Sequence, residues 1–366
     1  MGVEFDVRRC GRAEYQGFLN VLNEAFNFGE QGQWFQKKLS NCTPYPHLAT
    51  DAQIARHVVA VNRDNGDVMG GTGAYPFNLI VSEDVPGGER FVLPALGVGQ
   101  VCCAKKYRNL GVMSATLRAA LDDAAKDGAL VGFLGGDRYR YGRFGFDYGG
   151  GALKLDFSYE RLMTFTDTDD GNLETGVANT ADIGLLARLY ETLPSYLARD
   201  AAYWKMQLER DRYIWRFGHI GDDYAYIVYS DENTKNIVEI CGAPSTAVAL
   251  LVNHMKTHET DRVTVSLPFT PGRGDPLYEK LRAASSYAHA APNGMSLVAI
   301  LSAEKVYGIL KPAIDRMGVS PGDGFETGET VAYLLGSPGH PYPRFLRQNV
   351  APVRQFSLWL SEADGV

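Results

Sequence analysis

The spacing of hydrophobic residues in the first half of the chain alternates between the pattern of strands and that of helices. VEFDVRR at 3–9 alternates as a strand does, and AEYQGFLNVLNEAF at 13–26 repeats apolar residues at helical spacing. The stretch 55–81 predicts two strands that turn at Asn65-Gly66, a dipeptide strongly favoured in tight hairpins. RFVLPALGVGQVCCA at 90–104 predicts a further long strand.

A helix is predicted after Gly111, because apolar residues from Met113 to Ala124 recur on one face before Gly128 ends the pattern. ALVGFL, directly after it, is a short apolar run typical of a buried strand. Periodicity is then lost. The acidic cluster at 167–171 lacks the glycine and glutamate spacing of an EF-hand, which favours a solvated linker over a calcium loop.

Beyond this linker the order of elements partly repeats. Strand, strand, helix and strand are predicted in turn at 223–230, 235–242, 245–258 and 261–269. A helix at 303–317 then opens a last unit. Because 366 residues exceed one ordinary domain, two or three domains are expected. We predict an α/β fold with units at 1–160, 174–295 and 296–366.

Composition narrows the class of protein. An apolar content of 45% is that of a globular chain, and a net charge of −7 argues against nonspecific binding of nucleic acid. Five cysteines without a C-x-x-C pair favour a reduced, cytoplasmic setting over a disulfide framework. No apolar run approaches the ~18 residues of a spanning helix, and the N-terminus lacks the core of a secretory signal. We expect a soluble cytoplasmic protein that binds neither nucleic acid nor membrane.

KKYRNLGVM at 105–113 carries the clearest chemical signal. A helix start presents backbone N–H groups without intrahelical partners and a partial positive charge, so it suits a phosphate. Gly111 lets an anion approach the backbone, and Arg108 adds a guanidinium. R-x-x-G alone is more often an ordinary strand-to-helix turn. No P-loop pattern occurs, and GVGQVC at 97–102 lacks the third glycine of a dinucleotide site.

The strand at 90–104, R-x-x-G-x, the helix, ALVGFL and then RYGRFGFDYGG at 140–150 together resemble the acetyl-CoA core of the Gcn5-related N-acetyltransferase (GNAT) superfamily. Met113 replaces a small residue and Lys105 a proline. With Y-G-R-F-G at 141–145, these departures make the chain similar to the enhanced-intracellular-survival (Eis-like) acetyltransferases. The resemblance implies tandem GNAT-like domains, each a mixed, mostly antiparallel sheet with flanking helices, and a small, shortened sterol-carrier-like unit. It implies that only the first domain binds acetyl-CoA.

The resemblance also assigns roles to residues. It implies that acetyl-CoA is held by strand backbone, by the helix start and by the end of the next strand, at Val101, Cys102, Cys103, Arg108, Asn109, Leu110, Gly111, Val112, Met113, Ser114, Gly136 and Asp137. Tyr141 aligns with the general acid of the family, which protonates the departing thiolate. The terminal carboxylate, here that of Val366, would act as general base.

Acyl transfer from a thioester calls for such groups independently of any family. The amine must lose a proton, since the pKa of a lysine-like amine is about 10.4, and a tyrosine hydroxyl can protonate the thiolate. Tyr139 and Tyr148 lie close to Tyr141, and only the register of the motif selects Tyr141. Val366 also has alternatives among the carboxylates, namely Glu24, Glu30, Asp137, Glu362 and Asp364.

The pattern of histidines does not favour a metal. His254 and His258 have i, i+4 spacing on a helix, but no glutamate follows His254 and the face reads as solvated. We therefore expect an enzyme without a metal, which transfers an acetyl group from acetyl-CoA to an amine of a small molecule such as an aminoglycoside. The alternatives are a protein lysine or N-terminal acetyltransferase and a non-catalytic CoA-binding protein. A homo-oligomer is among the expected states.

Overall fold

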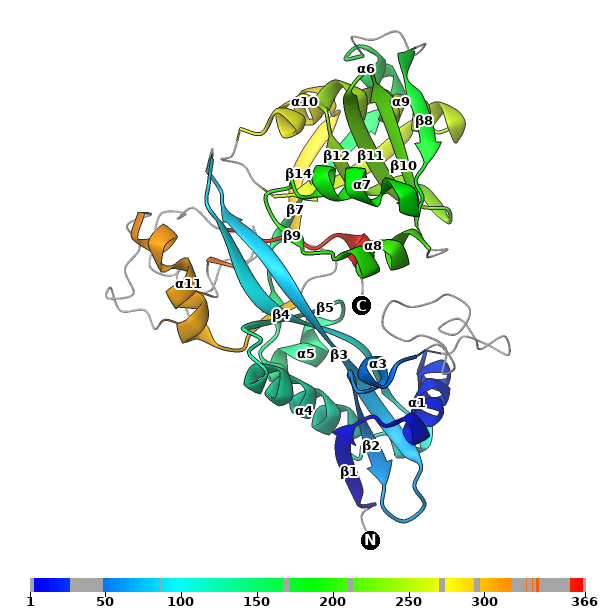
Figure 1. The fold of residues 1–366 in the computed structure, drawn as a ribbon, viewed down its shortest axis with the longest axis vertical. Coiled ribbons are helices and arrows are strands. Elements are labelled where there is room, and N and C mark those ends of the chain that lie inside the picture. Colours follow the sequence, from blue (N-terminus) through cyan, green and yellow to red (C-terminus); the bar gives the residue numbers. More distant parts are fainter. Residues whose placement is uncertain are drawn as a thin grey trace.

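A computed structural model of the chain describes 3–26, 49–85, 87–166, 172–209, 213–269, 274–292, 297–316, 327, 331, 334–335 and 356–364. Two mixed sheets, each covered by helices, make up this part of the protein (Figure 1). The predicted α/β fold is confirmed. None of the helices in the described ranges is long and apolar enough to cross a membrane.

The first sheet has the order β1-β2-β3-β4-β5-β15-β6, and β9 and β16 pair with β3. Only β4 and β5 run parallel, while the other neighbours are antiparallel. Its strands are β1 (Phe5–Arg9), β2 (His57–Asn62), β3 (Val68–Glu83), β4 (Arg90–Cys103), β5 (Val131–Leu134), β6 (Asp147–Tyr148), β9 (Tyr196–Leu197), β15 (Leu297–Ile300) and β16 (Phe356–Ser357).

The second sheet has the order β14-β7-β13-β12-β11-β10-β8. Among the described strands of this second sheet, only β12 and β13 run parallel. Its strands are β7 (Gly151–Ser158), β8 (Glu174–Val177), β10 (Ile214–Ile220), β11 (Asp223–Ser230), β12 (Asn233–Gly242), β13 (Arg262–Pro268) and β14 (Tyr287–Pro292).

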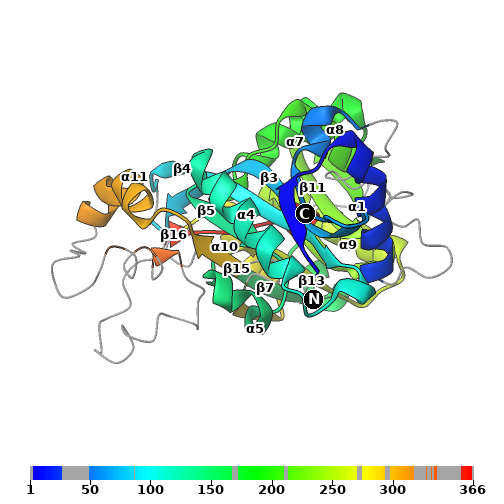
Figure 2. The same cartoon turned by 90° about the horizontal axis from the view of Figure 1, so that it is seen from below.

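Two helices cover opposite faces of the first sheet. A side chain at Gly70 would meet Val112 of the helix α4, whereas one at Gly71 would meet Phe18 of the helix α1. Since successive strand residues point to opposite faces, α1 and α4 lie on different sides of β3. Figure 2 shows the two helices apart, with β1 between them in the view. The glycines of β3 therefore let both helices pack closely.

The helices follow the predicted hydrophobic spacing. In α4 the buried residues Leu117, Ala120 and Ala124 lie on one face. The helices are α1 (Arg12–Ala25), α3 (Asp51–Ile54), α4 (Val112–Lys126), α5 (Arg138–Tyr141), α6 (Tyr159–Met163), α7 (Ile183–Tyr190), α8 (Ala201–Leu208), α9 (Pro244–Thr257), α10 (Pro276–Ala284) and α11 (Ala303–Arg316), with short 3-10 turns such as η1 (Lys105–Tyr107), η2 (Gly142–Phe144) and η5 (Glu362–Asp364).

The hairpin at Asn65-Gly66 is confirmed, because β2 and β3 pair antiparallel on either side of Gly66, whose φ is 74°. The spaced aromatic residues after 137 would suit a short strand, but 138–144 forms α5 and η2. Asp137 explains the helix, since its carboxylate accepts a hydrogen bond from the Tyr139 N–H and caps α5.

Strand pairing crosses the predicted domain limits at four strands. β7 lies before 160 but joins the second sheet, whereas β9, β15 and β16 lie after 174 but join the first sheet. The limits 1–160, 174–295 and 296–366 stay predictions, as does the sterol-carrier-like character of the last unit. Most of 317–355 lies outside the described residues.

Candidate active site

The carboxyl ends of β4 and β5 and the start of α4 meet at one place. The two parallel strands pair only from Ala95 with Val131 to Gly97 with Phe133. Beyond these residues, in a fully described part of the chain, β4 continues to Cys103 and pairs with β3 alone. In open α/β sheets a crevice at the carboxyl ends of diverging strands is the usual place for a ligand. The predicted cofactor residues surround this divergence.

The turn from β4 into α4 is shaped for an anion. Gly111 precedes the helix with a φ of 79°, and Asn109 has a φ of 65°. The Ala115 N–H donates to the Gly111 carbonyl at 2.9 Å, while no side chain in the described structure caps the helix start. Helix geometry leaves the amides that precede Ala115 without intrahelical partners. The start of α4 therefore offers backbone donors and a partial positive charge to a phosphate.

Two arginines flank this helix start. Arg108 is exposed at the end of η1. Arg143 reaches across from η2, and its Nη2 donates to Ser114 Oγ at 3.1 Å. Sequence reasoning missed Arg143 as a site residue, because nothing in the chain order shows that η2 lies beside α4. The Y-G-R-F-G motif was the one signal that pointed to it.

A β-bulge interrupts β4 at the divergence. Cys102 pairs with Gly71 and Gly99 with Gly73, so two residues, Gln100 and Val101, oppose a single residue of β3. Gln100 has a φ of 47°, which is unusual for a residue other than glycine. The bulge turns backbone groups of β4 out of the ladder at the start of the predicted pantetheine segment. This feature was not predicted from the sequence.

The adjacent cysteines of β4, Cys102 and Cys103, are free thiols that are largely shielded from solvent. Burial raises the pKa of the Cys102 thiol far above its usual range, and burial likewise raises that of Cys103. Such thiols stay protonated and are poor nucleophiles. Arg108 lowers the Cys103 pKa and Glu24 raises it, so both charges lie near the end of β4.

Tyr141 is buried at the end of α5, whereas Tyr139 is 96% exposed. Its ring packs against Phe146, and a side chain on Gly136 would overlap it. Burial raises the pKa of the Tyr141 hydroxyl, and the neighbouring Arg140 offsets part of this effect. The phenol therefore stays protonated across the neutral range, as a proton donor must.

The candidate bases lie in different places. Val366 and Glu30 fall outside the described residues. Asp137 caps α5. Glu362 lies 3.6 Å from the Lys154 amine, and the buried Asp364 pairs with Arg199. Glu24 is exposed on α1, and its Oε1 accepts the Lys105 N–H at 2.7 Å, which places this carboxylate at the end of β4.

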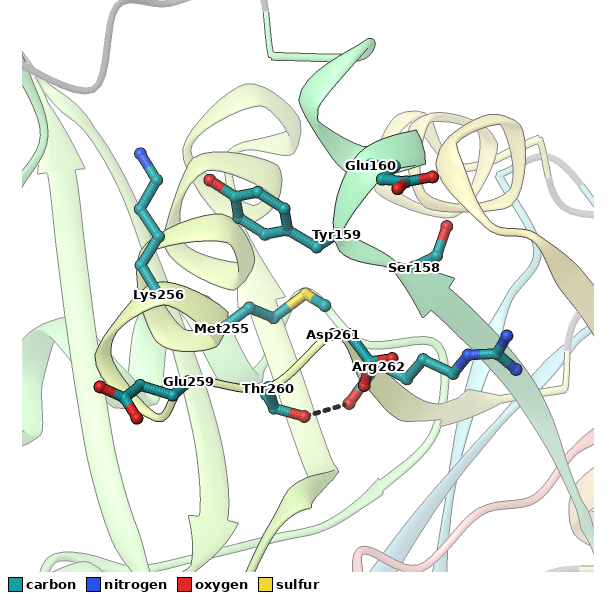
Figure 3. Close-up of a pocket in the computed structure, with 9 residues that line it drawn as sticks. All are labelled: Ser158, Tyr159, Glu160, Met255, Lys256, Glu259, Thr260, Asp261 and Arg262. Carbon is teal, nitrogen blue, oxygen red and sulfur yellow. Dashed lines mark hydrogen bonds between the residues drawn. The ribbon is translucent and has the colours of Figure 1, made fainter.

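A separate pocket of about 480 Å³ opens on the second sheet, between α6, the end of α9 and the start of β13 (Figure 3). Its charged side chains point outward around Met255, and the Thr260 hydroxyl donates to the Arg262 carbonyl at 2.9 Å. None of the predicted site residues lines it. The lining is Ser158, Tyr159, Glu160, Met255, Lys256, Glu259, Thr260, Asp261 and Arg262.

The prediction that the histidine face of α9 is solvated is wrong. His254 is fully buried, its Nε2 lies 2.7 Å from the Thr234 carbonyl oxygen, and its ring contacts that of Tyr229. The long apolar face of α9 explains this burial. Within the described ranges, no group of three or more His, Cys, Asp or Glu side chains is arranged to hold a metal ion.

Comparison with known proteins agrees with this geometry. Residues 6–149 match the model of an acetyltransferase (GNAT) domain. An uncharacterized N-acetyltransferase of Streptomyces coelicolor is 29% identical over 198 residues, which cover 49% of this chain and 46% of that protein. The chain thus aligns with less than half the length of this relative.

Solved structures share the fold. A GCN5-related N-acetyltransferase from Kribbella flavida superimposes with a TM-score of 0.60 at 15% identity, over 84% of this chain and 74% of that one. Eis1 from Mycobacterium abscessus does so with a TM-score of 0.55 at 18% identity, over 84% and 76%. Residues 6–149 thus match a GNAT domain, and the described part of the chain shares the fold of these two structures.

Proposed function

We propose that the protein is an acetyl-CoA-dependent N-acetyltransferase that acts on an amine of a small molecule. The observation that carries the proposal is the start of α4. It lies uncapped at the divergence of β4 and β5, preceded by the left-handed Gly111 and flanked by Arg108 and Arg143. This constellation falls inside the segment that matches the acetyltransferase domain.

Acetyl-CoA would lie along the end of β4 and across the start of α4. The residues Arg108 to Ser114 and the Arg143 guanidinium supply donors and positive charge for a pyrophosphate. Val101 to Cys103 begin within the bulge and would offer backbone to the pantetheine arm. Gly136 and Asp137, which follow β5, would border the cofactor on the other side.

In the proposed reaction the neutral amine attacks the thioester carbonyl carbon. The C–N bond forms, the C–S bond breaks, and the thiolate takes a proton from the Tyr141 hydroxyl. A base removes the proton that the amine nitrogen loses. Backbone N–H groups of the bulge would stabilise the charge that develops on the carbonyl oxygen. The buried Tyr141 hydroxyl stays protonated near neutral pH, so it has a proton to give.

The base stays a proposal. The Val366 carboxylate is the first candidate because of the family resemblance. Glu24 is the alternative that the geometry favours, because its carboxylate already contacts the backbone at the end of β4. Cytoplasmic location and a homo-oligomer likewise stay predictions.

Release of free thiol from acetyl-CoA, measured with a panel of amines, tests the function. We expect turnover with aminoglycosides or other small amines. Turnover with peptide lysines or N-termini alone would instead assign a protein acetyltransferase. Tight binding of acetyl-CoA without turnover on any amine would contradict the enzyme and favour a non-catalytic CoA-binding protein.

A further inference from the structure

A buried set of polar side chains lies behind the bulge of β4. The Tyr75 hydroxyl on β3 hydrogen-bonds the side-chain amide of Gln100 and lies 2.9 Å from His57 Nε2 at the start of β2. His57 Nδ1 in turn lies 3.0 Å from the Ile54 carbonyl oxygen. Gln100 is 6% exposed, Tyr75 1% and His57 0%. These side-chain contacts thus link the three neighbouring strands β2, β3 and β4.

The surroundings fix these side chains in place. The His57 ring lies 4.8 Å from that of Phe18 and 5.6 Å from that of Tyr15, both on α1. A side chain on Gly73 would overlap both the Tyr75 hydroxyl and the Gln100 amide, so the glycine makes the room that the contact needs. Aromatic packing and hydrogen bonding therefore hold Gln100 in one orientation.

The contact opposes a local strain. A residue with a Cβ in the left-handed region costs about 1–2 kcal/mol relative to extended backbone, and Gln100 adopts this conformation inside a strand. Without a partner for its side chain, β4 would gain by relaxing toward regular pairing with β3. Losing the Tyr75 hydroxyl would also leave buried polar groups of Gln100 and His57 short of one bond.

We propose that His57, Tyr75 and Gln100 are positioning residues that hold the bulge of β4, and with it the backbone that faces the acetyl thioester. This inference rests on the proposed function. None of the three side chains needs to touch acetyl-CoA. They act by keeping the out-of-ladder backbone groups of residues 100 and 101 aimed at the reacting carbonyl, where a small displacement lowers the rate steeply.

Tyr75→Phe tests the proposal. We expect kcat to fall about tenfold or more, because a misplacement of about 1 Å can cost up to 100-fold. The dissociation constant of acetyl-CoA should stay within about twofold, since the pyrophosphate site at the start of α4 is separate. The kinetics of free-thiol release and calorimetry on the full chain measure the two quantities.

Tyr226→Phe is the matched control. Tyr226 is also fully buried, and its hydroxyl donates to Glu239 Oε1 at 2.7 Å in the second sheet. It should lose stability as Tyr75→Phe does, but with unchanged kcat per folded molecule. An equal loss of kcat in both variants would reduce the role of Tyr75 to stability and overturn the proposal.

Gln100→Gly supplies a second variant that is expected to fold, because glycine adopts the left-handed conformation without strain. It removes the side-chain contact together with the strain that the contact opposes, so the bulge should persist and kcat should exceed that of Tyr75→Phe. Wild-type kcat in Tyr75→Phe, or an equal loss of kcat in Gln100→Gly, overturns the proposal. If the wild-type chain fails to turn over any amine, the proposed function fails instead. Hydrogen–deuterium exchange at 99–103 then decides the inference, with faster exchange expected in Tyr75→Phe and unchanged exchange contradicting it.

Discussion

The two parallel strand pairs of the described structure share the order strand, helix, strand, but they differ in the residues at the start of the helix. In the first unit β4, α4 and β5 follow one another, and in the second β12, α9 and β13 do so. Both pairs share only a short register, at 95–97 with 131–133 and at 236–237 with 264–265. Both therefore diverge toward their carboxyl ends, where open α/β sheets usually bind a ligand.

The two units differ in the connection that leads from the first strand into the helix. Eight residues, 104–111, join β4 to α4 and include Arg108 and the left-handed Gly111. Only Ala243 joins β12 to α9, and Pro244 then occupies the first helical position. Proline removes one of the amides that a phosphate would need. The second helix start has neither the length nor the donors for a cradle.

The second divergence is occupied by the chain itself. Trp359, Leu360 and Glu362 lie against Val238 of β12 and Ser266 of β13, with a residual cavity of only about 10 Å³. Arg199 anchors this C-terminal tail (356–364). Its guanidinium forms ion pairs with both Asp364 and Glu239 and lies 3.8 Å from the centre of the Tyr190 ring. A shared order of elements therefore does not imply a shared ligand. Whether a ligand can bind depends on the residues at the helix start and on whether other side chains already occupy the space between the diverging strands.

The largest effect is expected at this tail anchor. Arg199→Ala would leave the Glu239 and Asp364 carboxylates buried together without their cation, so we expect a loss of about 3–5 kcal/mol in the free energy of unfolding. Arg143→Ala in the exposed turn η2 should change it by no more than about 0.5 kcal/mol. Denaturant unfolding of both variants measures the contrast, and equal losses would contradict it.

The contribution of Asp364 to the free energy of unfolding should depend on pH. Burial raises the pKa of Asp364, so the stability contributed by this group is fully present below its unfolded pKa of about 4 and is lost as pH rises through the folded pKa. Asp364→Asn mimics the protonated carboxyl group. It should remove this part of the pH dependence while keeping the tail bound.

Tyr141→Phe should produce the largest loss of activity. The substitution removes the proposed proton donor, and general acids contribute about 100-fold or more to rate. We expect kcat to fall by about this factor while the unfolding midpoint changes little. Tyr139→Phe, at the exposed neighbour, should keep the wild-type rate. Wild-type kcat in Tyr141→Phe would remove Tyr141 from its role.

A buried histidine on α9 should make the free energy of unfolding depend on pH. Burial lowers the pKa of His254 on α9 to about 4, from about 6.5 in an unfolded chain. Between these values the unfolded state binds the extra proton, so stability falls as pH drops from 6.5 to 4, by about 2–3 kcal/mol. Unfolding of the wild type and of His254→Gln across this range measures it. Parallel pH curves would contradict the assignment.

The smallest predicted effect concerns one glycine. Gly111→Ala has room for its methyl group but strains a φ of 79°, and the added Cβ faces the proposed phosphate. We expect the dissociation constant of acetyl-CoA to rise about tenfold. Gly221→Ala, with equal room and a φ of 60° in the turn before β11, should cost similar stability and leave binding unchanged. Equal binding in both variants would argue against the cradle.

Local patterns were enough to predict much of this site. The spacing of apolar residues predicted β4, α4 and β5, and the motif around Arg108 and Gly111 indicated the turn between them. Helix periodicity and turn chemistry depend on residues close in sequence, which explains this success. The fold class follows from the same order of elements together with the family resemblance.

The remaining features depend on contacts between distant residues. Tyr75 and Gln100 meet only because β3 and β4 pair with a two-for-one register, and Arg143 reaches Ser114 from a separate turn. The Arg199 anchor joins residues 40 and 165 positions away. Strand register and side-chain direction are set by the packed sheet, so no local pattern announces them.

The number of acetyl-CoA molecules bound per chain tests the central claim most directly. Calorimetric titration of the full chain should give one site, strongly weakened in an Arg108→Ala, Arg143→Ala double variant. Lys154→Ala at the occupied second divergence should leave the affinity unchanged. Two sites per chain, or one site that is indifferent to both arginines, would contradict the assignment of the cofactor to the first unit.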